Sequence, residues 1–170
     1  MLRTQPAKID RMIAVRLIPA VAALVSVAMC QPPSLIVDGG NGKTVVLTAA
    51  DLSKLPQHTV NAGEHGVPAT FEGALLSDVL AKVDAPSGEK LRGKLMSLYL
   101  LVEAAVGYRA VFALEEFDAA FTDRKIYLAT KRDGKPLTEK EGPFRIVDPG
   151  EKRPARWVRQ VTALRIRQAN

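Results

Sequence analysis

The sequence is poor in the side chains that bind soft metals and form disulfides. Its 170 residues include one cysteine, two histidines and one tryptophan, and aromatic residues make up only 5% of the chain. A single cysteine cannot form an intramolecular disulfide, so the fold has no such staple. Hydrophobic residues make up 47%, which is enough for one domain of this length to bury an ordinary core.

Several motifs that carry catalytic chemistry are also missing. The chain has no phosphate-binding P-loop, no dinucleotide fingerprint and no serine in a nucleophile-elbow setting. His58 and His65 have a seven-residue offset that matches no familiar zinc motif, so each is interpreted as a surface strand or loop residue. Glu115 and Glu116 are interpreted as charges favoured near the start of a helix rather than as an acid/base pair.

Positive charge is abundant but local. The formal net charge is +6, of which residues 1–28 carry +3. Residues 29–150 hold 14 basic and 16 acidic side chains, whereas residues 151–170 carry a net charge of +5. A nucleic-acid interface usually combines a broad basic face with interleaved aromatic residues, and the basic segment offers only Trp157. The sequence therefore predicts no nucleic-acid partner.

The N-terminal segment predicts export. Basic residues precede an apolar run at residues 17–28, and small residues at 26–28 suit cleavage, so residues 1–28 are interpreted as a secretory signal peptide. Translation could start at Met1 or at Met12. A membrane anchor is the alternative, but the run is short of the roughly 20 residues that a spanning helix needs. We expect a periplasmic or secreted protein without a transmembrane span after cleavage.

Cys30 directly follows the predicted signal peptide. It could be a lipid-attachment site or an incidental free thiol. Met29 disfavours lipidation, because lipoprotein signals have a small residue before the cysteine. Residues 29–34 are interpreted as a linker, and residues 35–170 as one domain.

Within that domain, the pattern predicts several strands with short helices inserted between them. The expected strands are residues 35–37, 44–47, 58–60, 67–71, 95–102, 108–112, 125–130, 144–147 and 157–167. The expected helices are residues 48–55, 74–83 and 114–121. Turns are expected at residues 38–42, 61–63 and 133–134. Because strands and helices do not alternate regularly, the predicted class is α+β, mostly β.

Three segments in this order resemble the molybdopterin-binding domain of the sulfite oxidase family. Residues 71–80 (FEGALLSDVL) are similar to the family's aromatic-x-Gly-x-x-Leu-x-x-[Leu/Val]-Leu stretch. Residues 107–109 (GYR) resemble its Asp-Gly-Tyr turn, and residues 142–150 (GPFRIVDPG), followed by 156–158 (RWV), resemble its C-terminal part. The resemblance covers most of residues 35–167 and implies a fold like that domain.

The resemblance also implies a site for an anionic cofactor. Carried over residue by residue, it points to Tyr108, Arg109, Arg145 and Arg156 as contacts of molybdopterin or a similar ligand. Two interpretations stay open: Arg156 either meets a phosphate or lies on a solvated strand face, and Tyr108 either faces the ligand or belongs to the core.

Two departures from the family pattern weaken the cofactor hypothesis. The family's enzymes hold molybdenum through a cysteine thiolate before the aromatic-Gly stretch, and residues 57–73 contain no cysteine. Pro154 stands in the expected phosphate loop, where it removes an amide donor. We therefore expect no molybdenum centre held by cysteine and assign no metal ligand.

Three functions follow as hypotheses. The first is a non-redox binding or accessory module for a small anionic or pterin-like ligand, or for a protein partner in the cell envelope. The second is a molybdopterin-dependent oxidoreductase with oxygen or histidine ligands to the metal. The third is an envelope interaction protein with no small ligand, in which Arg109, Arg145 and Arg156 do not converge in space.

Overall fold

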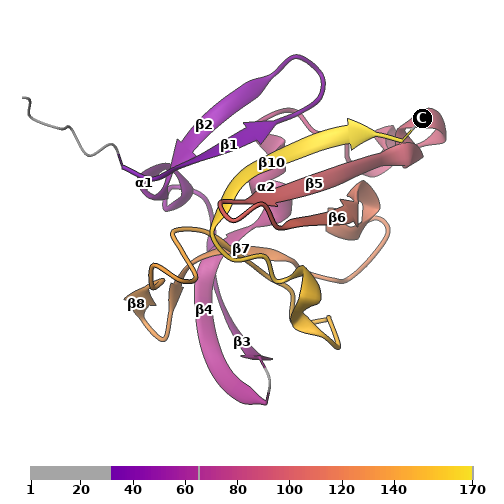
Figure 1. The fold of residues 1–170 in the computed structure, drawn as a ribbon. Helices are drawn as coiled ribbons and strands as arrows, with labels where there is room; N and C mark the ends of the chain where they lie inside the picture. The colour runs from indigo at the N-terminus through magenta and orange to yellow at the C-terminus, as the bar shows by residue number, and fades with distance from the viewer. Residues whose placement is uncertain (1–31, 65, 170) are drawn as a thin grey trace, which may run out of the picture. The chain divides into compact units, whose positions relative to one another are not determined.

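The computed structural model describes residues 32–64 and 66–169. The predicted signal peptide and Cys30 lie outside the described residues. Within them the chain forms two β-sheets joined by short helices (Figure 1). The first sheet has the strand order β2 (Thr44–Thr48), β1 (Ser34–Asp38), β10 (Val161–Gln168), β5 (Leu98–Ala104) and β6 (Arg109–Ala113). The second has the order β3 (Gln57–Glu64), β4 (Val67–Leu75), β7 (Tyr127–Arg132) and β8 (Lys135–Pro136), with β9 (Arg145–Val147) also paired to β7.

The helices of the described part are short. They are α1 (Ala49–Leu52), α2 (Leu76–Ala81) and the 3-10 helices η1 (Gly88–Lys90), η2 (Gly93–Ser97), η3 (Leu114–Phe117) and η4 (Pro154–Arg156). The structure is thus mostly β with a few short helices, which is compatible with the predicted α+β class. Across residues 32–64 and 66–169, no helix has both the length and the apolar character needed to cross a membrane.

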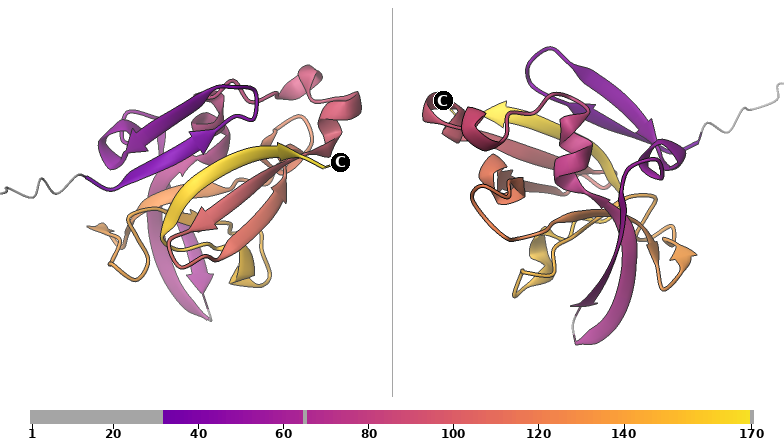
Figure 2. Two further views of the ribbon diagram at one scale, coloured as in Figure 1. Left: turned by 45° about the horizontal axis from the view of Figure 1, so that its top comes forward. Right: turned by 180° about the vertical axis from the view of Figure 1, so that it is seen from behind.

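Strand β10 lies at the centre of the first sheet. It runs parallel to β1 and antiparallel to β5, and the remaining neighbours in this sheet are antiparallel. Leu164 and Ile166 are buried, whereas Arg165 and Arg167 alternate with them on the wetter face. This is the predicted alternation of a half-buried strand. The β3–β4 hairpin of the second sheet extends away from the first sheet (Figures 1 and 2).

The centre of the second sheet, at the start of β7 and at β9, is buried on both faces. Leu128 of β7 and Ile146 of β9 join the main core, which also includes the inner face of the first sheet and the apolar side of α2. Their strand neighbours Ala129 and Val147 point the other way, into a smaller cluster that contains Phe71 and Trp157. The remaining residues of that smaller cluster are Ala69 and Tyr127. Trp157 comes from the loop before β10, so this loop is anchored on the outer face of the second sheet.

Some local predictions are confirmed. Residues 38–42 connect the antiparallel strands β1 and β2, and Thr48 and Asp51 form the expected capping box at α1. Asp133 and Gly134 connect β7 to β8 with φ values of 51° and 75°, the left-handed conformation that a tight hairpin turn requires.

Other predictions are wrong in detail. The turn expected at residues 61–63 lies inside β3, because pairing with β4 runs on to Glu64. The helix expected at 74–83 begins only at Leu76, since Ala74 and Leu75 still pair with β7. Residues 95–97 belong to η2 rather than to β5, α1 ends at Leu52, and the expected helix at 114–121 is only the 3-10 turn η3.

Candidate functional site

A cavity of about 900 Å³ lies where three distant parts of the chain meet. Its wall includes Gly63 and Glu64 at the end of β3, Val106 and Tyr108 in the β5–β6 connection, and much of the loop 151–160. A volume of this size is within the usual range for small-molecule sites. The cavity is therefore the candidate ligand site of this fold.

The cavity combines a buried apolar part with cationic side chains. Trp157 and Val158 line it and are only 4% and 1% exposed. The lining also contains four basic residues: Lys140, Lys152, Arg153 and Arg159. Among the described residues, the first three have no ion-pair partner. The apolar surface that a ligand can reach is contributed by Val106 and Tyr108, which are 77% and 49% exposed. Such a site can cover a flat organic group and still attract an anion.

Arg145 forms a buried ion-pair network behind this cavity. Its side chain is 0% exposed, and its guanidinium lies 5.2 Å from the ring centre of Phe71 and 5.7 Å from that of Trp157. It donates hydrogen bonds to Glu64, at 2.7 Å, and to Glu141. Its Nε has no hydrogen-bond partner among the described residues. Arg145 therefore balances the negative charge of Glu64 and Glu141 inside the protein.

Glu64 connects this network to the cavity. It lines the cavity and also accepts a hydrogen bond from Arg159 at 2.7 Å. Burial by itself would raise the pKa of Glu64, but the hydrogen bonds from Arg145 and Arg159 outweigh it and hold the pKa below its ordinary value. Glu64 is therefore ionised at neutral pH.

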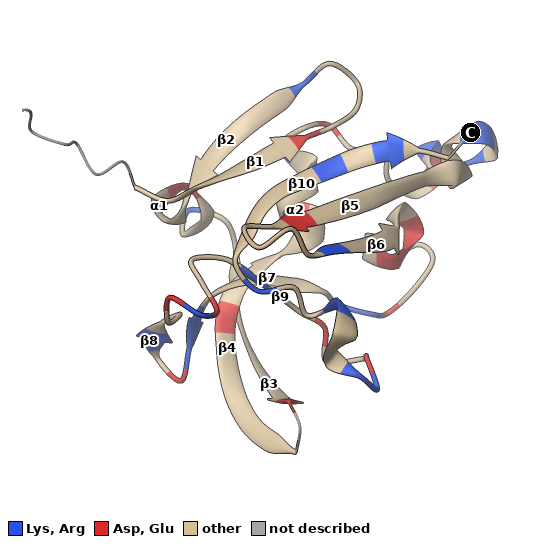
Figure 3. Cartoon of the chain, in the orientation of Figure 1, with Lys and Arg blue, Asp and Glu red and all other residues tan. Residues whose placement is uncertain are grey.

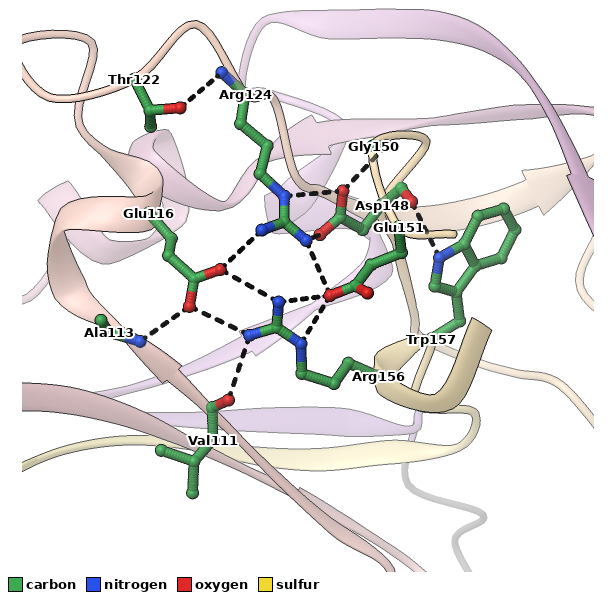
Figure 4. Close-up of polar contacts among 10 residues, drawn as sticks. All are labelled: Val111, Ala113, Glu116, Thr122, Arg124, Asp148, Gly150, Glu151, Arg156 and Trp157. Carbon is green, nitrogen blue, oxygen red and sulfur yellow. Dashed lines mark hydrogen bonds and ion pairs between the residues drawn. The ribbon is translucent and has the colours of Figure 1, made fainter. Parts of the chain in front are cut away.

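A second ion-pair cluster joins the loop 151–160 to Glu116 of η3 and to Arg124 (Figure 4). Arg124 donates to both oxygens of Asp148, at 3.1 and 2.5 Å, and Arg156 donates to both oxygens of Glu116, at 3.0 and 3.1 Å. Arg124 also pairs with Glu116 at 2.8 Å, and Glu151 contacts both arginines. These bidentate contacts are the strongest type of charge-assisted hydrogen bond. We call these five residues the Arg124–Arg156 cluster.

Acid should destabilise the protein through these carboxylates. The pKa values of Glu64 and Glu151 are lowered in the folded state, so their contribution is complete above the unfolded pKa of about 4.3 and is lost as the pH falls through the folded pKa. Chemical denaturation between pH 7 and 3 should give a steady free energy of unfolding down to about pH 5.5 and a decrease below about pH 4. Glu64→Gln should make this decrease shallower. An unchanged slope in that variant would contradict the assignment to Glu64.

The structure separates the four site residues predicted from the sequence. Tyr108 is the one that lines the cavity; it is half-exposed, and its hydroxyl donates to the carbonyl of Ala155 at 2.6 Å. Arg109 is exposed, with its Nε 3.5 Å from Glu103. Arg145 is buried, and Arg156 belongs to the Arg124–Arg156 cluster. The three arginines do not line the cavity, and their contact with an anionic ligand stays a prediction.

The basic C-terminal segment does not form one patch. Figure 3 shows its basic residues in two groups, one on β10 and one on the loop between β9 and β10. On β10, Arg165 donates to Glu103 at 2.8 Å and Arg167 donates to Asp38 at 2.8 Å. The free positive charge of the segment is therefore left to Lys152 and Arg153, beside the cavity.

The sequence did not single out the lysines of the cavity, or Arg124 and Glu151 of the Arg124–Arg156 cluster, as site residues. The available signal was the segment DPGEKRPAR at 148–156, which places charged residues between two strands. Such a segment predicts an irregular loop, and irregular loops carry many binding sites. The pairing of its arginines depends on Glu116, which lies 40 residues away from Arg156.

The described residues suit the organic part of a pterin cofactor better than its metal. The cavity offers an aromatic side chain and free cations, which could hold a pterin phosphate. In residues 32–64 and 66–169, no three His, Cys, Asp or Glu side chains are grouped so that they could hold a metal ion. His58 packs beside Tyr127, with 6.0 Å between the ring centres. Metal chemistry therefore has no assigned residue in the described part.

The fold of this chain is similar to that of a protein of known structure. The chain is similar to the crystal structure of the sulfane dehydrogenase SoxCD from Paracoccus pantotrophus, with 25% sequence identity and a TM-score of 0.59. The match covers 79% of this chain and 38% of the SoxCD chain, so this protein corresponds to well under half of that enzyme chain. It supports a fold related to the molybdopterin-binding domain expected from the sequence. No family model and no curated protein sequence matches the chain.

Proposed function

We propose that this protein is a non-redox binding module of the cell envelope that takes a small anionic ligand with a planar organic body, such as a pterin phosphate. The observation that carries this proposal is the cavity, which combines the exposed side chains of Val106 and Tyr108 with three cations that have no ion-pair partner among the described residues. The predicted signal peptide supports a periplasmic or secreted location.

The two parts of the cavity would act on different parts of the ligand. The planar body would pack against the apolar wall, where burial contributes about 25 cal/mol per Å². The anionic group would meet Lys152 and Arg153, whose charges are not already neutralised by neighbouring carboxylates. Charge attraction mainly speeds association, and the apolar wall lengthens the residence time.

The chain provides its own optical probe for this binding. Trp157 is the only tryptophan and lines the cavity, so its fluorescence should change when the cavity fills. We would titrate the full chain with neopterin monophosphate and use neopterin and inorganic phosphate as the two partial probes. Tighter binding of the complete compound than of either part supports the proposal. Equal, weak binding of all three would oppose it.

Removing the free cations should weaken this binding. We expect the double variant Lys152→Ala, Arg153→Ala to bind neopterin monophosphate at least about tenfold more weakly, because charge-assisted contacts contribute about 1.5–3 kcal/mol. The double variant Lys90→Ala, Lys94→Ala is the matched control, since these two lysines lie in η1 and η2 and do not line the cavity. Fluorescence titration measures both affinities. A loss of the same size in the control would indicate a general charge effect.

A second candidate function is an oxidoreductase that retains molybdopterin. The likeness to a sulfane dehydrogenase favours this candidate. Metal analysis together with pterin fluorescence, on protein purified from a molybdenum-replete periplasm, separates the two. Stoichiometric molybdenum would exclude the non-redox module, whereas pterin without metal would support it. Absence of both, with no binding of the probes, would favour an envelope protein that recognises another protein.

A further inference from the structure

Glu151 is the member of the Arg124–Arg156 cluster that also lines the cavity. Its side chain is 19% exposed and lines the cavity, whereas Arg124 and Arg156 do not. One oxygen, Oε1, accepts hydrogen bonds from Arg124 at 2.7 Å and from Arg156 Nε at 2.6 Å. Figure 4 shows this oxygen between the two guanidinium groups. The carboxylate therefore stands where an oxyanion entering from the cavity would meet both arginines.

The two arginines do not need Glu151 for charge balance. Arg124 has Asp148 as a bidentate partner, and Arg156 has Glu116. These two carboxylates already match the two guanidinium charges, so Glu151 is a third anion and gives the cluster a net charge of −1. Burial by itself would raise the pKa of Glu151, but hydrogen bonds from Arg156 and Arg124 lower it below its ordinary value. Glu151 is therefore present as a charged carboxylate at neutral pH.

We propose that Glu151 is a specificity-determining residue of the cavity, because it fills an anion position beside Arg124 and Arg156 and so excludes small free oxyanions such as phosphate. The inference rests on the proposed function of the cavity as an anion-binding site. A ligand with a planar body gains binding from the apolar wall at Val106 and Tyr108 and reaches Lys152 and Arg153 without displacing Glu151. A free phosphate lacks that apolar contribution and is repelled by the carboxylate. Repulsion of the wrong ligand is a common source of specificity.

Substitution of Glu151 should open the position to phosphate. Glu151→Gln removes the charge and with it the two ion pairs that hold the side chain between Arg124 and Arg156, so the neutral side chain can rotate out of the position. Each arginine keeps a carboxylate partner, Asp148 or Glu116. We expect this variant to bind inorganic phosphate at least about tenfold more tightly than the unchanged chain, since like charges in contact cost several kcal/mol. Isothermal titration calorimetry at low ionic strength measures both constants.

Glu116→Gln is the matched control. It removes the same charge from the same two arginines, but Glu116 does not line the cavity. We expect its phosphate affinity to stay within about twofold of the unchanged chain, because no position opens toward the cavity. A comparable gain in Glu116→Gln would show that only the net charge matters and would overturn the inference. No gain in Glu151→Gln would overturn it as well.

The outcome separates the inference from the proposed function. A phosphate gain in Glu151→Gln, without binding of neopterin monophosphate by the unchanged chain, would support the role of Glu151 and contradict the proposed ligand class. Binding of neopterin monophosphate that depends on Lys152 and Arg153, without any phosphate gain in Glu151→Gln, would support the proposed ligand class and contradict the role of Glu151. Glu151→Ala is the second variant should Glu151→Gln fail to fold. It removes both the charge and the side chain, so a gain of similar size is expected, and no gain would again overturn the inference.

Discussion

Replacement of Arg145 by methionine should lower the free energy of unfolding by about 3–5 kcal/mol. The side chain is 0% exposed and pairs with Glu64 and Glu141, which are themselves only 12% and 11% exposed. Methionine fills much of the space between Phe71 and Trp157 but leaves both carboxylates with one cation fewer. Removing one partner of a buried ion pair is costly because the other charge stays desolvated. Urea denaturation followed by Trp157 fluorescence measures the change.

Two further variants test whether charge is the reason. Arg109→Met is the control, because Arg109 is 67% exposed and its Nε lies 3.5 Å from Glu103; we expect a change below about 0.5 kcal/mol. The triple variant Glu64→Gln, Glu141→Gln, Arg145→Met should recover part of the lost stability, since it removes the two buried carboxylates, which Arg145→Met leaves only with the partly exposed Arg159 and Arg132 as partners. Stability of Arg145→Met within about 1 kcal/mol of the unchanged chain would contradict this account.

Replacement of Gly73 by alanine should cost at least about 3 kcal/mol or leave the protein insoluble. A Cβ atom at this position would lie 2.1 Å from the carbonyl oxygen of Leu128 and 2.6 Å from the Cα of Ala129. Both are backbone atoms of β7, at the point where the β4–β7 register shifts. No side-chain rotation can relieve such a contact, so the two strands would have to separate. Soluble expression and the denaturation midpoint measure the effect.

Gly63 is the matched control for Gly73. It lies in the neighbouring strand β3, and an added Cβ would come no closer than 3.6 Å to any atom. Gly63→Ala should therefore be neutral or slightly stabilising, because alanine reduces the freedom of the unfolded chain. A similar loss in both variants would mean that glycine at 73 is not required by the close approach of β7. The glycine of the aromatic-x-Gly stretch would then need another explanation.

The resemblance to the sulfite oxidase family anticipated the fold better than it anticipated the site. Its aromatic-Gly stretch coincides with the pairing of β4 with β7 and with the start of α2, which are features of packing. Its arginines are placed differently from the expectation. Arg145 lies in the core and Arg156 in an ion-pair cluster, because carboxylates from other parts of the chain neutralise them. A family signature in one sequence does not reveal those partners.

Local patterns predicted strands more accurately than helices. Alternation of Leu164 and Ile166 with Arg165 and Arg167 located the last strand, since pairing leaves one face of the strand wetter than the other. This strand begins at Val161 rather than at the expected residue 157. The helical spacing at 74–83 overestimated α2, because Ala74 and Leu75 form strand pairs with β7 that the spacing cannot indicate. Similarly, residues 61–63 have the composition of a turn, but the ladder with β4 holds them extended.

The sequence by itself determined the turns at residues 38–42 and 133–134, the alternation in the last strand and the excess of basic residues near the C-terminus, because these depend on neighbours within a few positions. Only the tertiary structure decided which of those basic residues stay free. Arg145 and Arg159 pair with Glu64 across 81 and 95 residues of sequence. The cavity is likewise assembled from segments that lie far apart in the sequence. Pairing over such distances depends on how the two sheets pack, and burial then makes each pair costly to break. Lys152 and Arg153 are left without partners among the described residues, which makes them the cations to test first.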